Sequence, residues 1–493
     1  MNPPYTRPTG QDGETVGIPV PSFAGFATSE EEQRAMSVQL SRIRTELKRN
    51  YQRTITQPYL ISPPAGHGNA GLASNFIDLA HAKLRPGGVM ALVLPAAFTQ
   101  GDAWKSAREL LSREYKDVLI VGISTRQAFS ADTDPAEILL VATRHNNPVP
   151  DPDPTGVAVS LRRRPTSQLE GSMIARAISA FTHTTGPLTL GTDTHVGSCF
   201  IGSLDTVFKS SDIISLNLIG FMVNLGKGLL TLPQTNEQVK IPITRLAELG
   251  NRGLYHMDIS GTTTGKNGLP RGPFDIFPLT EDDYPEYPVL WSHDAKRETR
   301  LVVAPDSKGL VRQNCQDKAV EKWRETASRL LYNRDFTMGS QPLAACLTDY
   351  PTIGGRAWPN FVVPDENWQI PLLLWANSTL GLMTFWWLGT RQQPGRSIIS
   401  ISRLPLMNTL DARCLTDEQI QACNALFMDF QDRSFLPAIE AFRDETRQQL
   451  DQFLLVDVLG LDKEILTGIE ILREQWCREP SVHGGKSTRA QGL

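Results

Sequence analysis

Hydrophobic residues between positions 72 and 143 form two patterns, helical spacing and continuous apolar runs. In residues 72–84 and 104–115 they recur at the spacing of an amphipathic helix. Residues 89–95, with the sequence VMALVLP, are almost wholly apolar, which is typical of a strand buried on both faces. Two further apolar runs predict strands at residues 118–123 and 137–143. This order of elements is expected at the end of a doubly wound α/β sheet.

The pattern changes after residues 146–157, a stretch rich in Pro and Asp that indicates a linker between domains. We therefore predict that residues 1–145 form the C-terminal half of a doubly wound, Rossmann-like sheet. Residues 158–410 combine short apolar runs with many Gly and Pro, and predict a mixed α+β domain. Residues 411–479 return to helical spacing, while residues 480–493 are polar, rich in Gly and expected to be disordered.

Local signals place individual elements within this outline. Ser29 is followed by three Glu residues and predicts a helix start, because a capping side chain and acids both favour the first turn. Thr416-x-x-Gln419 is a capping box that opens a helical apolar stripe. Residues 443–459 predict another helix that ends before Gly460, and residues 398–401 predict a strand.

The composition is that of an ordinary globular protein, with 40% hydrophobic and 21% charged side chains among 493 residues. The N-terminus lacks a basic stretch followed by an apolar run, so no export signal is predicted. Residues 371–388 are strongly apolar, but Asn377, Ser378 and Thr379 interrupt them, and we predict a buried helix rather than a membrane span. The six cysteines have no paired spacing, which indicates reduced thiols. We expect a soluble, cytoplasmic protein.

Asn2-Pro3-Pro4-Tyr5 carries a candidate chemistry, the methylation of an exocyclic amine. The lone pair of such an amine is delocalised into its ring, so an enzyme must hold the amino hydrogens with acceptors that favour the tetrahedral form. A side-chain amide oxygen and a carbonyl on a turn stiffened by prolines supply these acceptors. The aromatic ring that follows is suited to stacking on a base flipped out of a duplex. The alternative is a simple turn, since Asn and Pro are common turn residues.

The motif and the segments after it resemble bacterial N6-adenine DNA methyltransferases of restriction-modification systems. After NPPYTRP come KLRPGG, VMALVLP, AAFTQGDAWKSARELL and DVLIVGISTRQAFSADTDPAEILLVATR. GGRAWPNF, LLLWANSTLGLMTFWW and LLVDVLGL are similar to parts of the family's target-recognition region. The resemblance covers most of the chain. It implies an enzyme that transfers a methyl group from S-adenosylmethionine (SAM) to a flipped adenine in double-stranded DNA, with residues 158–410 reading the target sequence.

The resemblance also implies roles for individual residues. Asn2 and the Pro3 carbonyl accept the hydrogens of the adenine amino group, and Tyr5 stacks on the base. Phe129 takes the position of a second aromatic side chain near the flipped base, with core packing as its alternative. No metal ligand and no covalent intermediate is implied, because the rate of such enzymes comes from positioning and charge complementarity.

The donor-binding elements of the family have no counterpart in the sequence. They are a Gly-rich turn after the first strand and an acid after the second, and both precede the catalytic motif. Later glycines do not replace them: Gly66-His67-Gly68 follows two prolines rather than a strand, and no helix pattern follows Gly226-x-Gly228. We therefore expect a truncated enzyme, or a split one whose donor-binding half is a separate polypeptide. This chain alone is expected to bind SAM weakly or not at all.

Contacts to DNA are expected from the recognition domain. Because the net charge is −4, a local basic surface must hold the phosphates. The candidate clusters are Arg42-x-Arg44 with Lys48-Arg49, Arg162-Arg163-Arg164, and Arg391 with Arg396 and Arg403, and the last set is expected to contact DNA. An ordinary solvated face is the alternative for each cluster. Pro95 and Phe98 take positions that line the family's cleft, with packing as their alternative. The eight histidines show no metal-ligand spacing. A second hypothesis is a non-catalytic DNA-binding remnant, or the specificity partner of a split methyltransferase.

Overall fold

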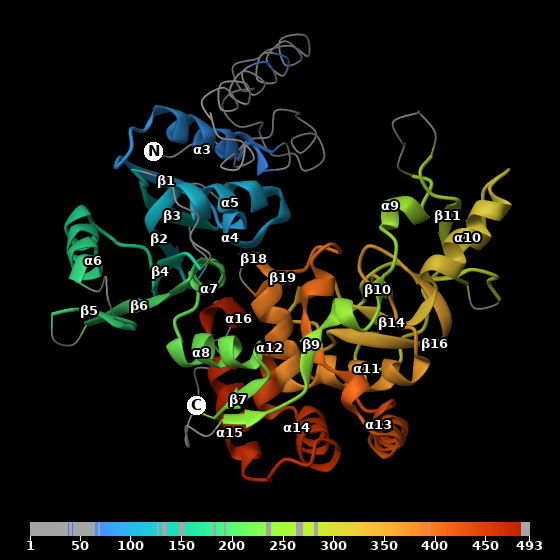
Figure 1. Ribbon diagram of the computed structural model, residues 1–493. Coiled ribbons are helices and arrows are strands. Elements are labelled where there is room, and N and C mark those ends of the chain that lie inside the picture. Colours follow the sequence, from blue (N-terminus) through green and yellow to red (C-terminus); the bar gives the residue numbers. More distant parts are fainter. Residues whose placement is uncertain are drawn as a thin grey trace. The chain divides into compact units, whose positions relative to one another are not determined.

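The computed structural model describes Val38, Arg42 and residues 65–67, 70–125, 128–130, 136–146, 153–180, 184–191, 194–232, 238–262, 270–280, 284–393 and 395–484. The chain divides into two compact units. Unit 1 contains Met1–Leu216 and Thr390–Gln393, and unit 2 contains Asn217–Gly389 and Pro394–Leu493. The two units are described separately (Figure 1).

Unit 1 alternates helices with the strands of one six-stranded sheet, and β18 is a further strand outside that sheet (Figure 1). The helices and strands predicted between residues 72 and 144 are confirmed to within three residues at each end. The elements of unit 1 are α3 (Leu72–Lys83), β1 (Val89–Pro95), α4 (Ala97–Gln100), α5 (Lys105–Glu114), β2 (Tyr115–Ile123), β3 (Glu137–Arg144), β4 (Thr155–Leu161), α6 (Gln168–Ala180), β5 (Gly186–Leu190), β6 (Thr194–Ser203), α7 (Leu204–Ser210) and β18 (Thr390–Gln393).

The sheet of unit 1 has six strands in the order β1-β3-β2-β4-β6-β5. β3 runs antiparallel to both of its neighbours, with Leu140 opposite Leu92 of β1 and Ile120 of β2. β2 and β4 are parallel, while β6 runs antiparallel to β4 and β5. Four strands therefore share one direction and two oppose it. The predicted α/β class is confirmed as a mixed sheet with helices, and the Rossmann-like assignment stays a prediction.

The side chains of the central strands alternate between two cores, one on each face of the sheet. Ile120 of β2 and Leu140 of β3 pack with buried residues of α3, α5 and α7. The next residue of β2, Val121, and the preceding residue of β3, Leu139, pack instead with Ile174 of α6. Successive side chains of a strand point to opposite faces, so this period of two positions α3, α5 and α7 on one face and α6 on the other.

β1 differs from the strand predicted at its position. Its partner among the described residues is β3, and it lies at the edge of the sheet. Met90, Leu92 and Leu94 are buried, whereas Val89 is 57% exposed. The prediction of a strand buried on both faces is therefore wrong, because only one face of β1 packs against the core.

The predicted boundary at residues 146–157 is also wrong. β4 begins at Thr155, inside this stretch, and pairs in parallel with β2 of the same sheet. Because the strands on both sides of the stretch belong to one sheet, the Pro- and Asp-rich residues connect elements within unit 1. The division between the units falls instead at Leu216.

His81 is a buried, titratable side chain in the core of unit 1. It is 5% exposed, and its Nδ1 lies 3.0 Å from the Tyr115 hydroxyl. Burial, and secondly the positive charge of Arg144, lowers the pKa of His81 from 6.5 to about 4. Below pH 6.5 the unfolded chain binds a proton that the folded unit binds only near pH 4. We therefore expect the stability of unit 1 to fall across this window, by about 1.4 kcal/mol per pH unit.

Amide hydrogen exchange in β1 and β3 measures this effect, after correction for the intrinsic influence of pH on exchange. Protection should decrease between pH 7 and pH 5 in the natural protein. His81→Gln removes the titrating group, so its protection should change less over the same interval. An equal change in both proteins would contradict the assignment to His81.

Unit 2 consists of short strands, several small sheets and helices (Figure 1). Its elements are α8 (Leu216–Leu225), β7 (Leu229–Thr231), β8 (Gln238–Lys240), β9 (Ile243–Arg245), β10 (Asn251–Arg252), α9 (His256–Ile259), β11 (Phe274–Pro278), β12 (Pro288–Leu290), β13 (Ser307–Val311), α10 (Gln316–Thr326), β14 (Ser328–Tyr332), β15 (Asp335–Thr337), β16 (Ala345–Gly354), β17 (Phe361–Val362), α11 (Gln369–Asn377), α12 (Thr379–Leu388), β19 (Arg396–Ile398), β20 (Asn408–Leu410), α13 (Asp417–Phe430), α14 (Glu445–Gln452), α15 (Ile465–Cys477) and α16 (Pro480–His483).

The largest sheet of unit 2 has five strands in the order β11-β13-β12-β16-β14. β12 and β16 are parallel, and the other neighbouring strands are antiparallel. Three further antiparallel pairs join β7 to β8, β9 to β20 and β10 to β17, and β15 pairs with β19. Mixed strands and helices are thus present as predicted for residues 158–410, but within different boundaries.

The apolar stretch at residues 371–388 forms two helices instead of the single helix predicted. α11 ends at Asn377, and the Ser378 side chain caps α12 by accepting a hydrogen bond from the Gly381 N–H (3.1 Å). Every residue of α12 is buried, so the predicted burial is confirmed. Among the helices that the structure describes, none combines the length and apolar character needed to cross a bilayer.

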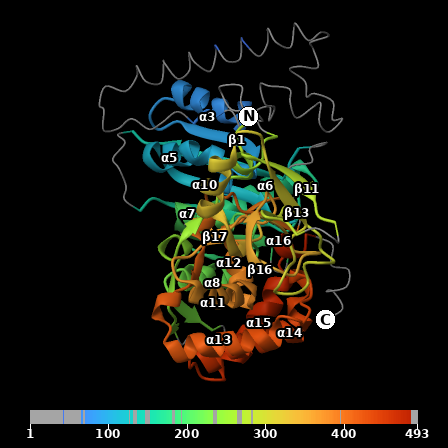
Figure 2. The ribbon, with the colours of Figure 1, turned by 90° about the vertical axis from the view of Figure 1, so that its right-hand side faces the viewer.

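The helices α13, α14 and α15 gather at one end of unit 2 (Figures 1 and 2). Both bonds of the capping box predicted at Thr416 and Gln419 are present at the start of α13. The helix predicted at residues 443–459 is α14 followed by a π-helical segment, Phe453–Val458, and it ends before Gly460, where φ is +68°.

Of three other predictions, one changes in its bounds and two concern segments that lie partly outside the described residues. The strand predicted at residues 398–401 is β19, which ends at Ile398. α16 occupies the start of the tail predicted to be disordered, and residues 485–493 lie outside the described residues. The helix predicted after Ser29 also lies outside them, except for Val38 and Arg42, which are helical.

Candidate functional site

The predicted catalytic residues Asn2, Pro3 and Tyr5 lie outside the described residues. Phe129, the second residue predicted to stack on the base, lies among the described residues and is half-buried. It packs against the core cluster that contains Val121 and Val159. This contact is the packing alternative considered for Phe129, and its contact with a flipped base stays a prediction.

The second pair of candidates, Pro95 and Phe98, lies at the carboxyl end of β1. Phe98 is fully buried, and its ring packs edge-on against Trp104 (5.6 Å between centroids) and Phe208 (5.7 Å). A ring enclosed in this way stabilises the junction of α4, α5 and α7. The packing alternative therefore describes Phe98, while Pro95 is half-buried at the end of the strand.

The two glycine clusters use their backbone N–H groups within the fold. The Gly66 N–H donates to the Asp78 carboxylate (2.8 Å). The Gly226 and Gly228 N–H groups donate to the carbonyls of Met222 (3.1 Å) and Leu225 (2.9 Å), at the end of α8. A turn that binds the carboxylate or ribose of SAM needs free N–H groups, and Gly66, Gly226 and Gly228 offer none.

Arg391, the first of the expected DNA contacts, belongs to unit 1 and has a side chain that is only 1% exposed. Its Nε donates to Asp212 Oδ2 (3.0 Å), its Nη2 donates to Asp212 Oδ1 (2.8 Å), and Nη2 also donates to the Lys209 carbonyl. A buried guanidinium held in this fork is not available to a phosphate. The expectation for Arg391 is therefore wrong, and its ion pair has a structural role.

The other two expected contacts, Arg396 and Arg403, belong to unit 2. Arg396 has a side chain that is 38% exposed and forms a two-bond ion pair with Asp335, Nε to Oδ1 at 2.6 Å and Nη2 to Oδ2. Arg403 is half-buried at the residue before a short 3-10 helix, Leu404–Leu406. The three arginines are thus not brought together in one unit, and Arg396 lines a cavity of unit 2.

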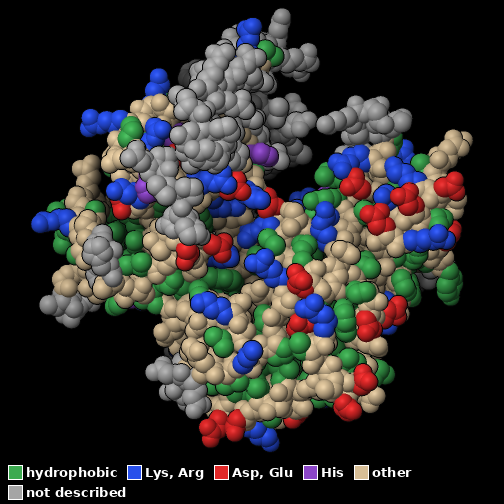
Figure 3. Space-filling view, in the orientation of Figure 1, with side chains coloured by type: hydrophobic (Ala, Val, Ile, Leu, Met, Phe, Trp, Pro, Cys, Tyr) green, Lys and Arg blue, Asp and Glu red, His purple; other side chains and the backbone are tan. Residues whose placement is uncertain are grey.

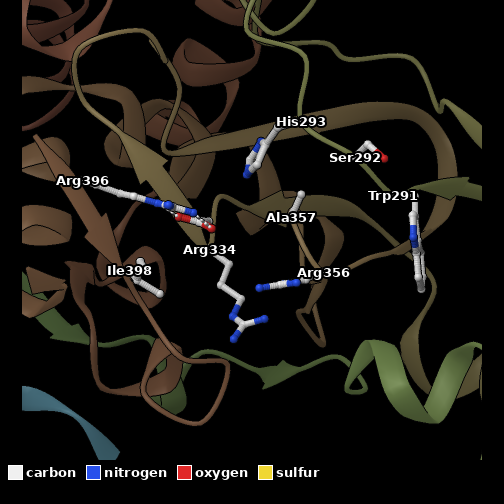
Figure 4. A pocket seen from close by; sticks show the side chains of 9 residues that line it. Trp291, Ser292, His293, Arg334, Arg356, Ala357, Arg396 and Ile398 are labelled. Atoms are coloured by element: carbon white, nitrogen blue, oxygen red, sulfur yellow. Dashed lines mark hydrogen bonds and ion pairs between the residues drawn. The ribbon is translucent and has the colours of Figure 1, made fainter. Parts of the chain in front are cut away.

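That cavity, in unit 2, has a volume of about 530 Å³. Its wall is formed by four segments: the residues that follow β12, the turn between β14 and β15, the loop after β16, and β19 (Figure 4). The lining residues are Trp291, Ser292, His293, Arg334, Asp335, Arg356, Ala357, Arg396 and Ile398. Three arginines and one carboxylate make the cavity positively charged.

Backbone hydrogen bonds fix the position of Arg334, whereas little negative charge compensates the charge of its guanidinium. Its N–H donates to the Ala357 carbonyl (2.9 Å), and its own carbonyl accepts from the Ile399 N–H (2.9 Å). Its Nε is buried and has no hydrogen-bond partner. Burial, and secondly the nearby Arg356 charge, lowers the pKa of Arg334, and the closeness of Asp335 opposes only part of this shift.

His293 forms the opposite part of the wall (Figure 4). Its Nδ1 lies 3.2 Å from Glu298, a buried carboxylate that also accepts hydrogen bonds from Trp358 Nε1 (2.9 Å) and the Asp294 N–H (2.8 Å). The Nε2 atom of His293 is buried and has no partner. The carboxylate thus orients the ring, and Nε2 is left for another group.

The positive charge continues outside the cavity toward α9. The pKa of His256, at the start of α9, is lowered first by burial and then by the charges of Arg334 and Arg356, while the Asp258 carboxylate opposes part of this shift. Arg252 lies over the Tyr255 ring, 4.5 Å from its centroid. In Figure 3 Lys and Arg side chains face the viewer around α9, with acidic side chains beside them toward α10.

This cavity could not be predicted from the sequence. Its arginines occur singly in segments that are separated by 22 and 40 residues along the chain, at positions 334, 356 and 396. None belongs to a basic cluster with a second cavity residue. Arg396 is therefore a candidate from the sequence, but no spacing in the sequence links it to Arg334 and Arg356.

No protein-family model matches the chain, and no curated protein matches it. Among solved structures, the type IIG restriction endonuclease BpuSI matches with 12% identity and a TM-score of 0.35, over 90% of this chain and 53% of that chain. The type IIL restriction-modification enzyme MmeI, solved in complex with DNA, matches with 11% identity and a TM-score of 0.33, over 84% and 52%.

A third structure, a modification subunit of a type I restriction enzyme from Vibrio vulnificus YJ016, matches with 21% identity and a TM-score of 0.21, over 29% of this chain and 32% of that chain. The chain thus spans about half the length of BpuSI and MmeI. All three likenesses are to restriction-modification enzymes, at levels of identity and TM-score too low to assign a fold or a function.

Proposed function

We propose that the chain carries the catalytic motif and the target-recognition region of an N6-adenine DNA methyltransferase that uses SAM. The observation that carries this proposal is Asn2-Pro3-Pro4-Tyr5, followed in order by the segments that resemble the methyltransferase family. The mixed α/β sheet of unit 1 is compatible with it. The positively charged cavity of unit 2 is compatible with a DNA-binding role for that unit.

In this proposal the chain's own residues bind and orient the adenine. The Asn2 side-chain oxygen and the Pro3 carbonyl accept hydrogen bonds from the amino group, and this pairing returns the nitrogen lone pair to a reactive geometry. Tyr5 stacks on the flipped base and offsets the stacking that the base loses in the duplex. Phe129 is a further stacking candidate. SAM, when bound, supplies the methyl group.

No donor site is assigned among the described residues, where the N–H groups of Gly66, Gly226 and Gly228 are engaged within the fold. The proposal therefore assigns donor binding to no residue of the described chain. A separate donor-binding half of the methyltransferase remains part of the proposal.

Mapping of modified bases in genomic DNA tests the proposed function. The gene, with its natural flanking sequence, is introduced into a host that lacks adenine methylation, and the DNA is read by single-molecule sequencing. We expect N6-methyladenine at one position of one short sequence, in nearly all of its copies. Modification of cytosine at N4 would overturn the choice of base. DNA binding without any methylation would favour the specificity-partner hypothesis.

A further inference from the structure

Two guanidinium groups in the cavity of unit 2 have no counter-charge. Among the described residues, neither the Arg334 nor the Arg356 side chain has a hydrogen-bond partner or a carboxylate oxygen within 4.0 Å. Asp335 is the one carboxylate of the wall, and both of its oxygens are bound by Arg396. The cavity therefore keeps an excess of positive charge from Arg334 and Arg356.

The two side chains converge on the same region of the cavity. Figure 4 shows Arg334 and Arg356 pointing toward one another, with His293 on the far side. The hydrogen bond from the Arg334 N–H to the Ala357 carbonyl holds the two segments together. Like charges in this arrangement repel, and partial burial of Arg334 weakens the hydration of its guanidinium, whereas Arg356 is exposed. An anion bound between the two guanidinium groups would relieve both effects.

We propose that this cavity binds a phosphodiester group of duplex DNA, with Arg334 and Arg356 as the two ligands. This inference rests on the proposed function. A guanidinium presents a fork of donors that matches the oxygens of a phosphate. His293 is held by the contact of its Nδ1 with Glu298 (3.2 Å), and no donor to the phosphate is assigned to it.

The surroundings favour a polyanion over a single small anion. The cavity, at about 530 Å³, has room for a phosphate together with its sugar, and the Trp291 side chain supplies an aromatic wall. The charges of Arg334 and Arg356 also act on His256 of α9, outside the cavity, where Asp258 opposes them and is paired with Arg271 (2.6 Å). A continuous backbone of phosphates matches an extended field.

The binding of a labelled duplex to the full chain tests the inference. Fluorescence anisotropy is measured at several salt concentrations for the natural chain, Arg334→Gln and Arg356→Gln. We expect each variant to bind about tenfold more weakly near 0.1 M salt, and the slope of log K against log salt to become less negative by about one. Arg334→Lys, which keeps the charge without the fork, is expected to bind with intermediate affinity.

Arg324→Gln is the matched control, because Arg324 is exposed on α10 and does not line the cavity. It should bind DNA as the natural chain does, and circular dichroism should show the same fold in all variants. Affinities of Arg334→Gln and Arg356→Gln equal to that of the control would overturn the inference while leaving the proposed function intact. Inorganic phosphate bound by the natural chain and lost in Arg334→Gln, with unchanged DNA affinity, would also overturn it. A natural chain that binds no DNA would contradict the proposed function itself.

Discussion

Asn2→Ala is expected to lower the rate of methyl transfer by about 10²–10³-fold, the usual effect of removing one preorganised hydrogen-bonding group from a reaction centre. The side-chain oxygen of Asn2 is proposed to accept one amino hydrogen of the flipped adenine. Without it, the nitrogen lone pair stays delocalised into the ring and the base is poorly oriented. Most of the affinity for DNA comes from phosphate contacts, so DNA binding should stay nearly unchanged.

The measurement is the transfer of a labelled methyl group in the natural gene context, together with the dissociation constant for the same duplex. Tyr5→Phe is the matched control, because it keeps the stacking ring and should retain most of the activity. Tyr5→Ala removes the ring and should reduce activity. An equal loss of methylation and of DNA affinity in Asn2→Ala would contradict the role assigned to Asn2.

The local structure of unit 1 was largely predictable from the sequence. The helices α3 and α5 follow from a period of 3.6 residues and the strands β1, β2 and β3 from short apolar runs, and both patterns depend only on neighbouring positions. The neighbours of each strand were not predictable. The run at residues 89–95 is apolar enough for a central strand but forms an edge strand, because pairing depends on segments distant in sequence.

The predicted domain boundary failed for a related reason. Pro- and Asp-rich composition at residues 146–157 is equally typical of an interdomain linker and of a connection within one sheet. The pairing of β4 with β2 decides between them, and that pairing involves residues such as Val118 and Gly156, which lie 38 positions apart. Composition contains no information about such a partner.

The candidate DNA contacts show the same limit for side chains. Arg391 and Arg396 are five residues apart and indistinguishable by sequence. Arg391 is buried against Asp212, which lies 179 positions away, whereas Arg396 pairs with Asp335 at the wall of a cavity. The availability of an arginine to a phosphate depends on its distant partners. Whether an arginine is available to a phosphate therefore follows from the structure and not from the presence of a basic cluster in the sequence.

Asp451→Ala is expected to destabilise unit 2 by about 3–5 kcal/mol, because it leaves a buried guanidinium without its partner. Asp451 is 1% exposed and accepts hydrogen bonds from the Thr379 N–H (2.8 Å), the Thr379 hydroxyl (2.5 Å) and Arg473 Nη2 (3.0 Å). Arg473 Nε also donates to the Thr379 hydroxyl (2.9 Å). The carboxylate thus lies at the N-terminus of α12, where the helix dipole favours a negative charge, and links this helix to α14 and α15.

Urea unfolding followed by tryptophan fluorescence measures this loss, since eight of the nine tryptophans belong to unit 2 and Trp386 and Trp476 pack 6.5 Å apart between α12 and α15. Asp457→Ala is the control: Asp457 is exposed, and its removal should change the stability by less than about 0.5 kcal/mol. Arg473→Met combined with Asp451→Ala should recover part of the loss, because no unpaired charge then stays buried. A loss below about 1 kcal/mol in Asp451→Ala would show that water or a neighbouring group replaces the carboxylate, and that the ion pair does not hold α12 in place.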